Sequence, residues 1–360
     1  MEWKGTGHVA LKAAPLPRWG ELPQGVQRIA APVIDISSDQ EFADLLKMLP
    51  VDIAEMVEPR IRETEEIVFS LGQGLEVSYG ALRVTLGRVV TESDLKSLDI
   101  VGNWRADGRL GIDGALHRLA RFTELGNTTN LVKIRVARVL VGVAEPLRNV
   151  LRTMKRGLLI IGPPGVGKTT LLRDVIRILQ EYHGGQLFVV DTSLEICGEG
   201  KRPHPFLRLG HRVQVGHPGR QKEVLDLTIM NGGASIFVVD EMGYRGDIEL
   251  IVFAAGRAVQ PTGTVHGEKL MDVVSESRLR PLLGLSTELD NEVQGAVAGH
   301  FGLTIEIHGK GKYRIHPDTD TSVTNLLAGK APVFFDVQLE IMDAAETAPI
   351  RQLDLDWHER

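Results

Sequence analysis

Apolar residues in the first third of the chain change from helical spacing to strand spacing. After Ser38, whose spacing to Glu41 fits a capping box, four apolar residues recur at i, i+3, i+4 and i+7: Phe42, Leu45, Leu46 and Leu49. Three runs then alternate apolar and other residues, with glycines between them, which is typical of antiparallel strands: Ile67/Phe69/Leu71, Leu75/Val77/Tyr79 and Leu82/Val84/Leu86. Thr91-Glu-Ser-Asp94 predicts a second helix start. Residues 36–120 are therefore expected to form a compact α+β module.

Beyond Arg156, short apolar runs alternate with Gly-rich turns and amphipathic segments. The runs typical of buried strands are Leu158–Ile161, Leu187–Val190, Ile236–Val239 and Gly263–Val265. Because helical segments separate these runs, the pattern predicts βαβ units, and hence an α/β fold with a mostly parallel sheet and helices on both faces. Strand-like alternation returns at Leu303–Ile307, Tyr313–Ile315 and Val333–Ile341.

These patterns divide the 360 residues into four expected parts. Residues 1–35 carry several prolines and are expected to form an extended N-terminal arm. Residues 36–145 should form the smaller α+β domain with a linker strand. Residues 146–300 should form the α/β core, and residues 301–360 a β-rich extension and tail.

Composition narrows the class of protein. The net charge of −6 removes the simplest electrostatic argument for a protein that coats nucleic acid or an anionic membrane. The single cysteine, Cys197, excludes an intramolecular disulfide and is expected to be a small core residue. No apolar stretch approaches the roughly 20 residues that span a bilayer. We therefore expect a soluble intracellular protein without a membrane span.

The strongest chemical motif lies between the strand at 158–161 and an amphipathic helix. It comprises Gly162, Pro163, Pro164, Gly165, Val166, Gly167, Lys168, Thr169 and Thr170. Glycines let backbone N–H groups approach a polyphosphate, and the helix N-terminus adds partial positive charge. Lys168 is expected to reach the β- and γ-phosphates of ATP, and the Thr169 hydroxyl to bind Mg²⁺. The alternative is a Gly-rich turn that matches by chance.

A second candidate site ends the apolar run Ile236–Val239. Asp240 follows the run directly, at the sheet edge where the phosphate loop is expected to open. A carboxylate there suits Mg²⁺, which Asp240 can hold through water. Glu241 is placed to orient or deprotonate the water that attacks the γ-phosphate. The alternative is a strand-end carboxylate that caps the next helix.

Two further strands end in polar residues. Asp191 and Glu195 follow Leu187–Val190 and are candidates to polarise water or hold the cation, or else to act as a helix cap and a surface acid. His266 follows the run at Gly263–Val265, where it can contact the γ-phosphate or Glu241 and report hydrolysis. A structural or solvated histidine is the equal alternative.

Hydrolysis by such sites usually needs a positive charge against the γ-phosphate, often from a neighbouring subunit. The candidate arginines are Arg135, Arg138, Arg212 and Arg245. We favour Arg212 first and Arg135 second, although each can equally be a solvated strand or loop charge.

An ordered set of motifs over about residues 40–345 resembles the stage III sporulation protein AA-like ATPases and, among them, the cyanobacterial and plastid relatives. The matching segments are Leu86–Leu95, Gly111–Arg118, Arg135–Arg138, Val190–Glu195, His204-Pro205, Arg212–Gln214, Val239–Glu241, Gly263–Gly267 and Ala331–Ile341. The resemblance implies a RecA-like P-loop core related to ring-forming secretion ATPases. It supports Asp191, Glu195 and His266 as nucleotide-site residues, and the cytoplasm or the plastid stroma as the location.

The resemblance also implies a homo-oligomer, a hexameric ring being suspected. The C-terminal domain that binds single-stranded nucleic acid in many of those relatives does not follow this core, so direct nucleic-acid binding is not expected. The leading hypothesis is an ATP-hydrolysing motor that does work on a protein complex or a nucleic acid. The alternative is an ATP-gated scaffold with little turnover. A P-loop kinase needs an Arg-rich lid, which we do not find.

Overall fold

The computed structural model describes residues 25–80, 82–124, 128–191, 194–215, 220–243, 247–287 and 298–342. The chain forms two compact units. We call the first the core unit; it contains Met1–Asp35, Leu140–Thr192 and Leu209–Arg360. We call the second the N-terminal unit; it contains Ile36–Val139 and Ser193–Arg208. Each unit is described by itself.

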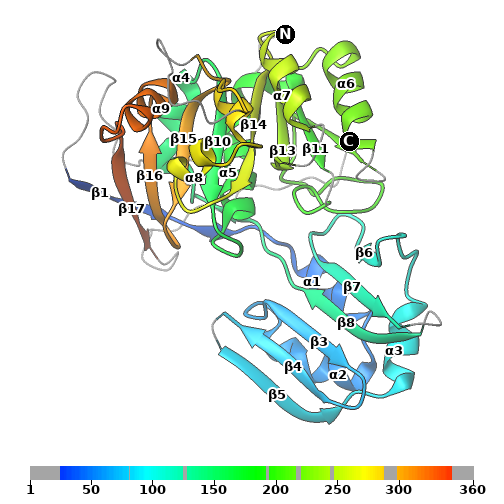
Figure 1. Cartoon of the computed structure of the whole chain (residues 1–360). Helices are drawn as coiled ribbons and strands as arrows, with labels where there is room; N and C mark the ends of the chain where they lie inside the picture. Colours follow the sequence, from blue (N-terminus) through cyan, green and yellow to red (C-terminus); the bar gives the residue numbers. More distant parts are fainter. Residues whose placement is uncertain are drawn as a thin grey trace, which may run out of the picture. The chain divides into compact units, whose positions relative to one another are not determined.

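The N-terminal unit is an antiparallel sheet with strand order β5-β4-β3-β8-β7-β6, packed against helices (Figure 1). The strands are β3 (Glu66–Ser70), β4 (Gly74–Tyr79), β5 (Leu82–Val89), β6 (Arg109–Gly111), β7 (Arg118–Thr123) and β8 (Thr129–Arg135). The helices are α1 (Asp39–Leu46), α2 (Val51–Val57), the 3-10 turn η1 (Glu58–Arg60) and α3 (Glu92–Asp99). Alternate strand residues such as Ile67 and Ile134 share one buried cluster with Leu45, Ile53 and Leu98 of the helices.

The capping boxes explain where two of these helices begin. Ser38 and Glu41 form a complete capping box at α1, and Thr91 and Asp94 form another at α3. Each box satisfies N–H groups that the first helical turn leaves without partners. Both predicted helix starts and the antiparallel sheet are therefore confirmed.

Residues 194–208 extend the N-terminal unit by close backbone contact. Gly198 and Gly200 have φ values of +79° and +95°, and a Cβ at these positions would lie 2.3 Å from the Ala115 carbonyl and 2.4 Å from Asp113. Only glycine fits both conditions. The buried His204 Nε2 then lies 3.1 Å from Glu41 Oε2 on α1. The segment between β11 and β12 is thus fastened to the N-terminal unit.

A buried histidine makes the N-terminal unit sensitive to acid. His117 is 1% exposed, and its Nδ1 accepts the Ala137 N–H at 3.2 Å. Burial lowers the pKa of His117 to about 4, although the charge of Glu41 opposes this shift. Since the pKa in the unfolded chain is about 6.5, the unfolded state binds more protons between these values. The stability contributed by neutral His117 is present above that window and is lost as the pH falls through it.

We therefore expect the free energy of unfolding of the N-terminal unit to fall by about 2 kcal/mol between pH 7 and pH 5 because of His117. His117→Gln retains an acceptor for the Ala137 N–H but cannot be protonated, so the drop should shrink by that amount. Urea unfolding of both proteins at the two pH values measures it. Equal drops in the wild type and the variant would contradict the assignment.

The core unit contains a sheet with strand order β1-β17-β16-β15-β10-β14-β13-β11-β12. The strands, in chain order, are β1 (Val26–Pro32), β10 (Gly157–Gly162), β11 (Leu187–Asp191), β12 (His211–Gln214), β13 (Ile236–Glu241), β14 (Gln260–His266), β15 (Phe301–Ile307), β16 (Lys312–His316) and β17 (Phe335–Met342). Strands β15, β10, β14, β13, β11 and β12 pair in parallel, whereas β16 is antiparallel to both neighbours. The predicted mostly parallel sheet is confirmed.

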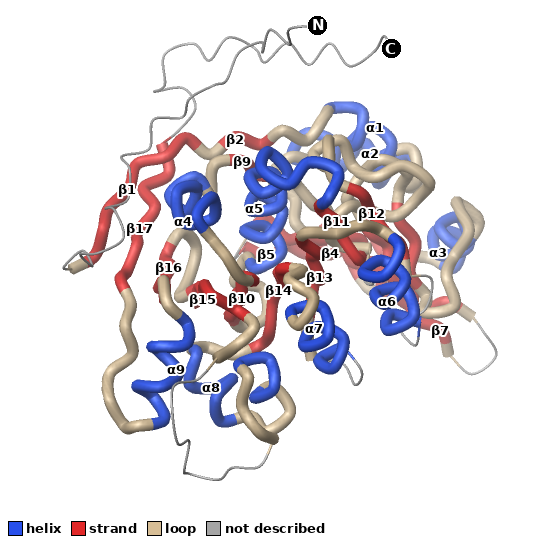
Figure 2. Tube along the Cα trace, turned by 90° about the horizontal axis from the view of Figure 1, so that it is seen from above, coloured by secondary structure: helices blue, strands red, loops and turns tan. Residues whose placement is uncertain are grey.

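Helices cover both faces of this sheet (Figure 2). They are α4 (Arg148–Thr153), α5 (Lys168–His183), α6 (Gln221–Asn231), α7 (Asp247–Ala255), α8 (Leu270–Ser275) and α9 (Thr319–Leu327). Figure 2 shows α4 and α5 on one side of the strands and α7, α8 and α9 on the other. Phe237, Ile251 and Val265 belong to one buried cluster between strands and helices. Within the described ranges, no helix has the length and apolar character needed to cross a bilayer.

The first and last described strands of the core unit pair at one edge of the sheet. β1 pairs in parallel with β17, and Val26 lies opposite Asp336. Residues 26–32, which the pattern places in an extended arm, are therefore an edge strand of the core sheet. β15, β16 and β17 continue that sheet beyond β10, so the described strands after residue 300 belong to the core sheet.

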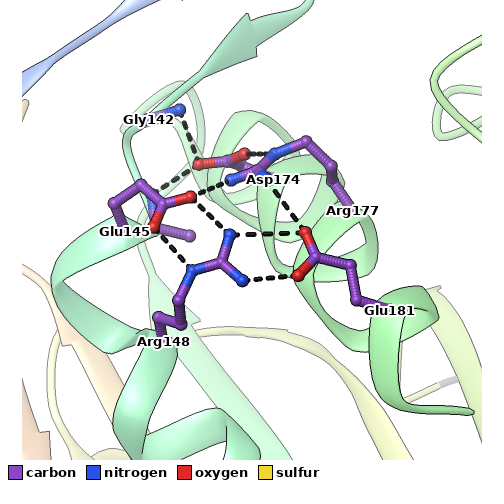
Figure 3. Close-up of polar contacts among 7 residues, drawn as sticks. Gly142, Glu145, Arg148, Asp174, Arg177 and Glu181 are labelled. Carbon is purple, nitrogen blue, oxygen red and sulfur yellow. Dashed lines mark hydrogen bonds and ion pairs between the residues drawn. The ribbon is translucent and has the colours of Figure 1, made fainter. Parts of the chain in front are cut away.

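A polar cluster fastens α5 to the segment that follows β9 (Leu140–Val141) (Figure 3). The Asp174 side chain on α5 is fully buried, and its Oδ2 accepts the N–H groups of Gly142 at 2.9 Å and Ala144 at 2.7 Å. Its Oδ1 accepts Arg177 Nε at 2.6 Å. Arg177 and Arg148 also form ion pairs with Glu145, the first residue of the 3-10 turn η2 (Glu145–Leu147). The cluster fixes the helix whose N-terminus follows the Gly-rich loop.

Candidate nucleotide-binding site

The Gly-rich loop joins the buried strand β10 to the first turn of α5. Gly162 ends the strand, and Gly167 is the N-cap of α5 with φ +107°. This left-handed conformation, shared by Gly165 with φ +75°, turns the chain sharply into the helix. Thr169 and Thr170 lie in the first turn and are half-buried. Loop and helix N-terminus together make a cradle suited to phosphate.

Lys168 bridges the loop and the neighbouring strand. Its Nζ donates to the carbonyl oxygens of Gly162 at 2.8 Å and Pro163 at 3.0 Å, and lies 3.2 Å from Nδ1 of His266. Lys168 is 8% exposed. Burial lowers the pKa of Lys168 below its ordinary value, and the negative charges of Glu241 and Asp240 offset only part of this effect. Both carboxylates therefore lie within electrostatic reach of the lysine.

His266 connects this lysine to Glu241. His266 lies directly opposite Gly162 in the β10–β14 pairing, and its Nε2 is 2.8 Å from Glu241 Oε1. A charged lysine can only donate, so His266 Nδ1 accepts from Lys168 and Nε2 carries the proton donated to Glu241. One continuous chain of contacts thus runs from the phosphate loop through β14 to the end of β13.

The end of β13 is irregular, which determines where its two acids lie. The pairing of β13 with β14 shifts register after Val239, so that Glu241 lies opposite Thr264. Thr264 Oγ1 donates to the Asp240 carbonyl at 2.5 Å. The Glu241 side chain reaches His266 from this position, and it is 42% exposed and open to water. The structure brings together Lys168, Asp240, Glu241 and His266.

The donor atoms present fit Mg²⁺. Thr169 offers a hydroxyl and Asp240 a carboxylate, and oxygen ligands are those that this hard cation prefers. In the part of the chain that the structure describes, no three His, Cys, Asp or Glu side chains form a cluster able to hold a metal. A cation bound here would therefore depend on phosphate oxygens and water for most of its ligands, as is usual for Mg²⁺.

The two other acids suggested by the sequence, Asp191 and Glu195, lie in different units. Asp191 is fully buried at the end of β11, next to β13, because Val190 pairs with Val239. Glu195 belongs to the N-terminal unit, where it pairs with Arg118 and lies 3.7 Å from Arg135. The roles of Asp191 and Glu195 at a nucleotide stay predictions.

The candidate arginines differ in what they contact. Arg138 donates to the Thr64 carbonyl at 2.8 Å, which is a structural contact. Arg212 lies on β12, four strands from β10, or roughly 19 Å at the usual strand spacing of about 4.8 Å. Arg245 lies outside the described residues. Arg118 was not among the sequence candidates, although it ends the matching segment Gly111–Arg118.

Comparison with known proteins identifies the family. The family model described as "Sporulation stage III, protein AA" matches residues 109–291, about half of the chain. The chain belongs to this family. Its core has the RecA-like P-loop fold, and 14% identity with a TM-score of 0.52 relates it to the pilus retraction motor PilT, over 81% of this chain and 83% of that one.

Relatives of this sporulation-protein family occur in bacteria and plants. The chain is 29% identical to stage III sporulation protein AA of Bacillus subtilis (strain 168) over 285 residues, which are 76% of this chain and 82% of that protein. It is 30% identical to SEEDLING PLASTID DEVELOPMENT 1 of Arabidopsis thaliana, over 85% of this chain and 46% of the relative. It is 28% identical to ycf45 of Porphyra purpurea, over 81% of this chain and 54% of the relative. The chain thus spans about half the length of the last two.

Proposed function

We propose that this protein is a Mg²⁺-dependent ATP hydrolase of the motor type. The observation that carries the proposal is the contact chain Lys168–His266–Glu241, with Asp240 beside it at the mouth of the phosphate loop. A lysine in a phosphate cradle, with a carboxylate for the metal and another for the attacking water, is an arrangement suited to phosphoryl transfer to water. The solved structure of the pilus retraction motor PilT contains bound ADP, which supports the same class of ligand.

The contacts indicate what each side chain does during hydrolysis. The triphosphate enters the cradle, and Lys168 Nζ exchanges the Gly162 carbonyl and His266 for β- and γ-phosphate oxygens. Glu241 takes a proton from the attacking water as the water oxygen bonds to the γ-phosphorus. The bond from the γ-phosphorus to the oxygen that bridges to the β-phosphate breaks, and ADP and inorganic phosphate leave. His266 Nε2–H donates to the Glu241 carboxylate and holds it in place. Mg²⁺ near Thr169 and Asp240 would neutralise phosphate charge.

Work on a partner is proposed to need a homo-oligomer. Arg212 lies on β12, the edge strand of the core sheet that is four strands from the strand preceding the phosphate loop. An arginine on an edge strand can instead serve the site of a neighbouring copy, as in many motor ATPases. We propose a ring, with a protein complex rather than nucleic acid as the object moved. The alternative is an ATP-gated scaffold, in which Glu241 stays bound to His266 and turnover is slow.

Purified protein tests the proposal directly. We expect steady-state phosphate release from Mg·ATP, its loss in EDTA, and a larger sedimentation coefficient with a non-hydrolysable ATP analogue. Lys168→Ala should lose nucleotide binding, because it removes the positive charge that faces the β- and γ-phosphates. Failure of the wild type to bind ATP would overturn the proposal. A monomer with and without the analogue would contradict the ring alone.

A further inference from the structure

The turn between β15 and β16 leaves the core sheet at the same edge as the phosphate loop. β15 is the parallel neighbour of β10 on the side away from β14, and Glu306 pairs with Ile161. A Cβ on Gly162 would lie 3.4 Å from Cβ of Ile307, the last residue of β15. The turn that begins at His308 therefore starts beside the first residues of the phosphate loop.

This turn is compact and rich in groups that bind anions. It reads His308-Gly-Lys310-Gly-Lys312, and it is closed by hydrogen bonds from His308 N–H to the Lys312 carbonyl at 2.9 Å and from Lys312 N–H to the Gly309 carbonyl at 3.0 Å. All three basic side chains are exposed. Among the residues with described positions, neither lysine side chain makes an ion pair or hydrogen bond. The fold therefore leaves these cations available.

A buried carboxylate orients the histidine of the turn. Glu306 is 2% exposed, and its Oε2 lies 2.9 Å from His308 Nε2. Its Oε1 accepts the Leu270 N–H at 2.7 Å and lies 3.0 Å from Nε2 of the buried His316. Burial raises the pKa of Glu306, but these hydrogen bonds outweigh it and lower the pKa, so Glu306 is ionised at neutral pH. With Nε2 held, the Nδ1 atom of His308 is left for a ligand.

The direction of a bound triphosphate follows from the strand order. Glu241 and His266 end β13 and β14, on one side of β10, whereas the turn lies on the other side. The γ-phosphate must face Glu241 for water to attack it. A triphosphate lying across the cradle therefore directs its α-phosphate and nucleoside toward β15.

We propose that His308–Lys312 is the nucleoside-side wall of the nucleotide site. Lys310 binds the α-phosphate, and His308 Nδ1 bonds a ribose hydroxyl, of a nucleoside di- or triphosphate. The assignment deepens the proposed function and depends on it. It places two binding residues far along the chain from the phosphate loop, and it gives Glu306 the part of a positioning residue for His308.

Calorimetric titration with Mg²⁺ and three probes tests this wall: ATP, ADP and inorganic tripolyphosphate. We expect Lys310→Ala to raise the Kd of all three about tenfold, as for the loss of one charged contact. His308→Ala should raise the Kd of ATP and ADP about fivefold and leave that of tripolyphosphate unchanged, since the latter has no ribose.

Matched variants separate the possible failures. Lys330→Ala removes an exposed lysine elsewhere in the core unit and should leave every Kd unchanged. His308→Gln, whose amide can still meet Glu306, should recover part of the ATP affinity, which a loss of folding would not allow. If the wild type binds ATP, Lys168→Ala does not, and His308→Ala and Lys310→Ala bind like the wild type, this wall is refuted while the proposed function stands. If the wild type does not bind ATP, the proposed function itself fails.

Discussion

Glu241→Gln is expected to reduce steady-state phosphate release by about 100-fold or more while leaving ATP binding intact. The amide has nearly the shape of the carboxylate and can still accept the His266 Nε2–H, so the contact chain survives. It cannot take a proton from water, however, and a general base contributes about 10²–10⁴ in rate. Phosphate release and nucleotide binding, measured on the same preparation, check both parts.

An acid in the same region provides the control. Glu268 is exposed two residues after His266 and has no part in the contact chain, so Glu268→Gln should keep wild-type turnover. If Glu241→Gln hydrolyses ATP at the wild-type rate, another group is the base. If neither the two variants nor the wild type hydrolyses ATP, the scaffold alternative is favoured.

Asp174→Ala is expected to lower the free energy of unfolding of the core unit by about 3–5 kcal/mol. The substitution leaves the N–H groups of Gly142 and Ala144 without their acceptor and Arg177 without one of its two buried carboxylates. Removing one partner of a buried ion pair costs about this much, because the remaining charge stays buried. Urea unfolding monitored by circular dichroism measures the change.

Glu181, at the exposed edge of the same polar cluster, provides the control for Asp174→Ala. Glu181 pairs with Arg148 and Arg177, but its side chain is 37% exposed. Exposed pairs contribute about 0–1 kcal/mol, so Glu181→Gln should have little effect. Equal losses in the two variants would show that the buried bonds to the segment after β9 are not the source of the stability.

The sequence was sufficient to predict the elements that depend on local pattern. The apolar runs predicted β10, β11, β13 and β14, and because parallel strands end at one edge, the positions of Lys168, Asp240, Glu241 and His266 followed. The capping residues likewise predicted the starts of α1 and α3. In each case the signal lies within a few residues of the element that it specifies.

Contacts between distant segments were beyond the sequence. No residue near Val26 indicates pairing with Asp336. β1 pairs with β17 because β17 has an unpaired edge once it has joined β16 in the sheet. Glu195 follows a core strand, yet the close contacts of Gly198 and Gly200 hold its segment in the N-terminal unit. The sequence shows the basic residues of the turn that begins at His308. Only the register of β15 against β10 relates this turn to the phosphate loop.

The pairing of β1 with β17 also constrains how the chain is made. Val26 emerges from the ribosome long before its partner Asp336, so β1 must wait unpaired through most of synthesis. The strands of the N-terminal unit are contiguous in sequence and can associate much sooner, although their last segment, 194–208, arrives only after β11. Contacts so far apart in sequence slow the final step of folding. A nascent chain released before residue 335 would therefore expose the side of β16 that β17 covers in the complete sheet.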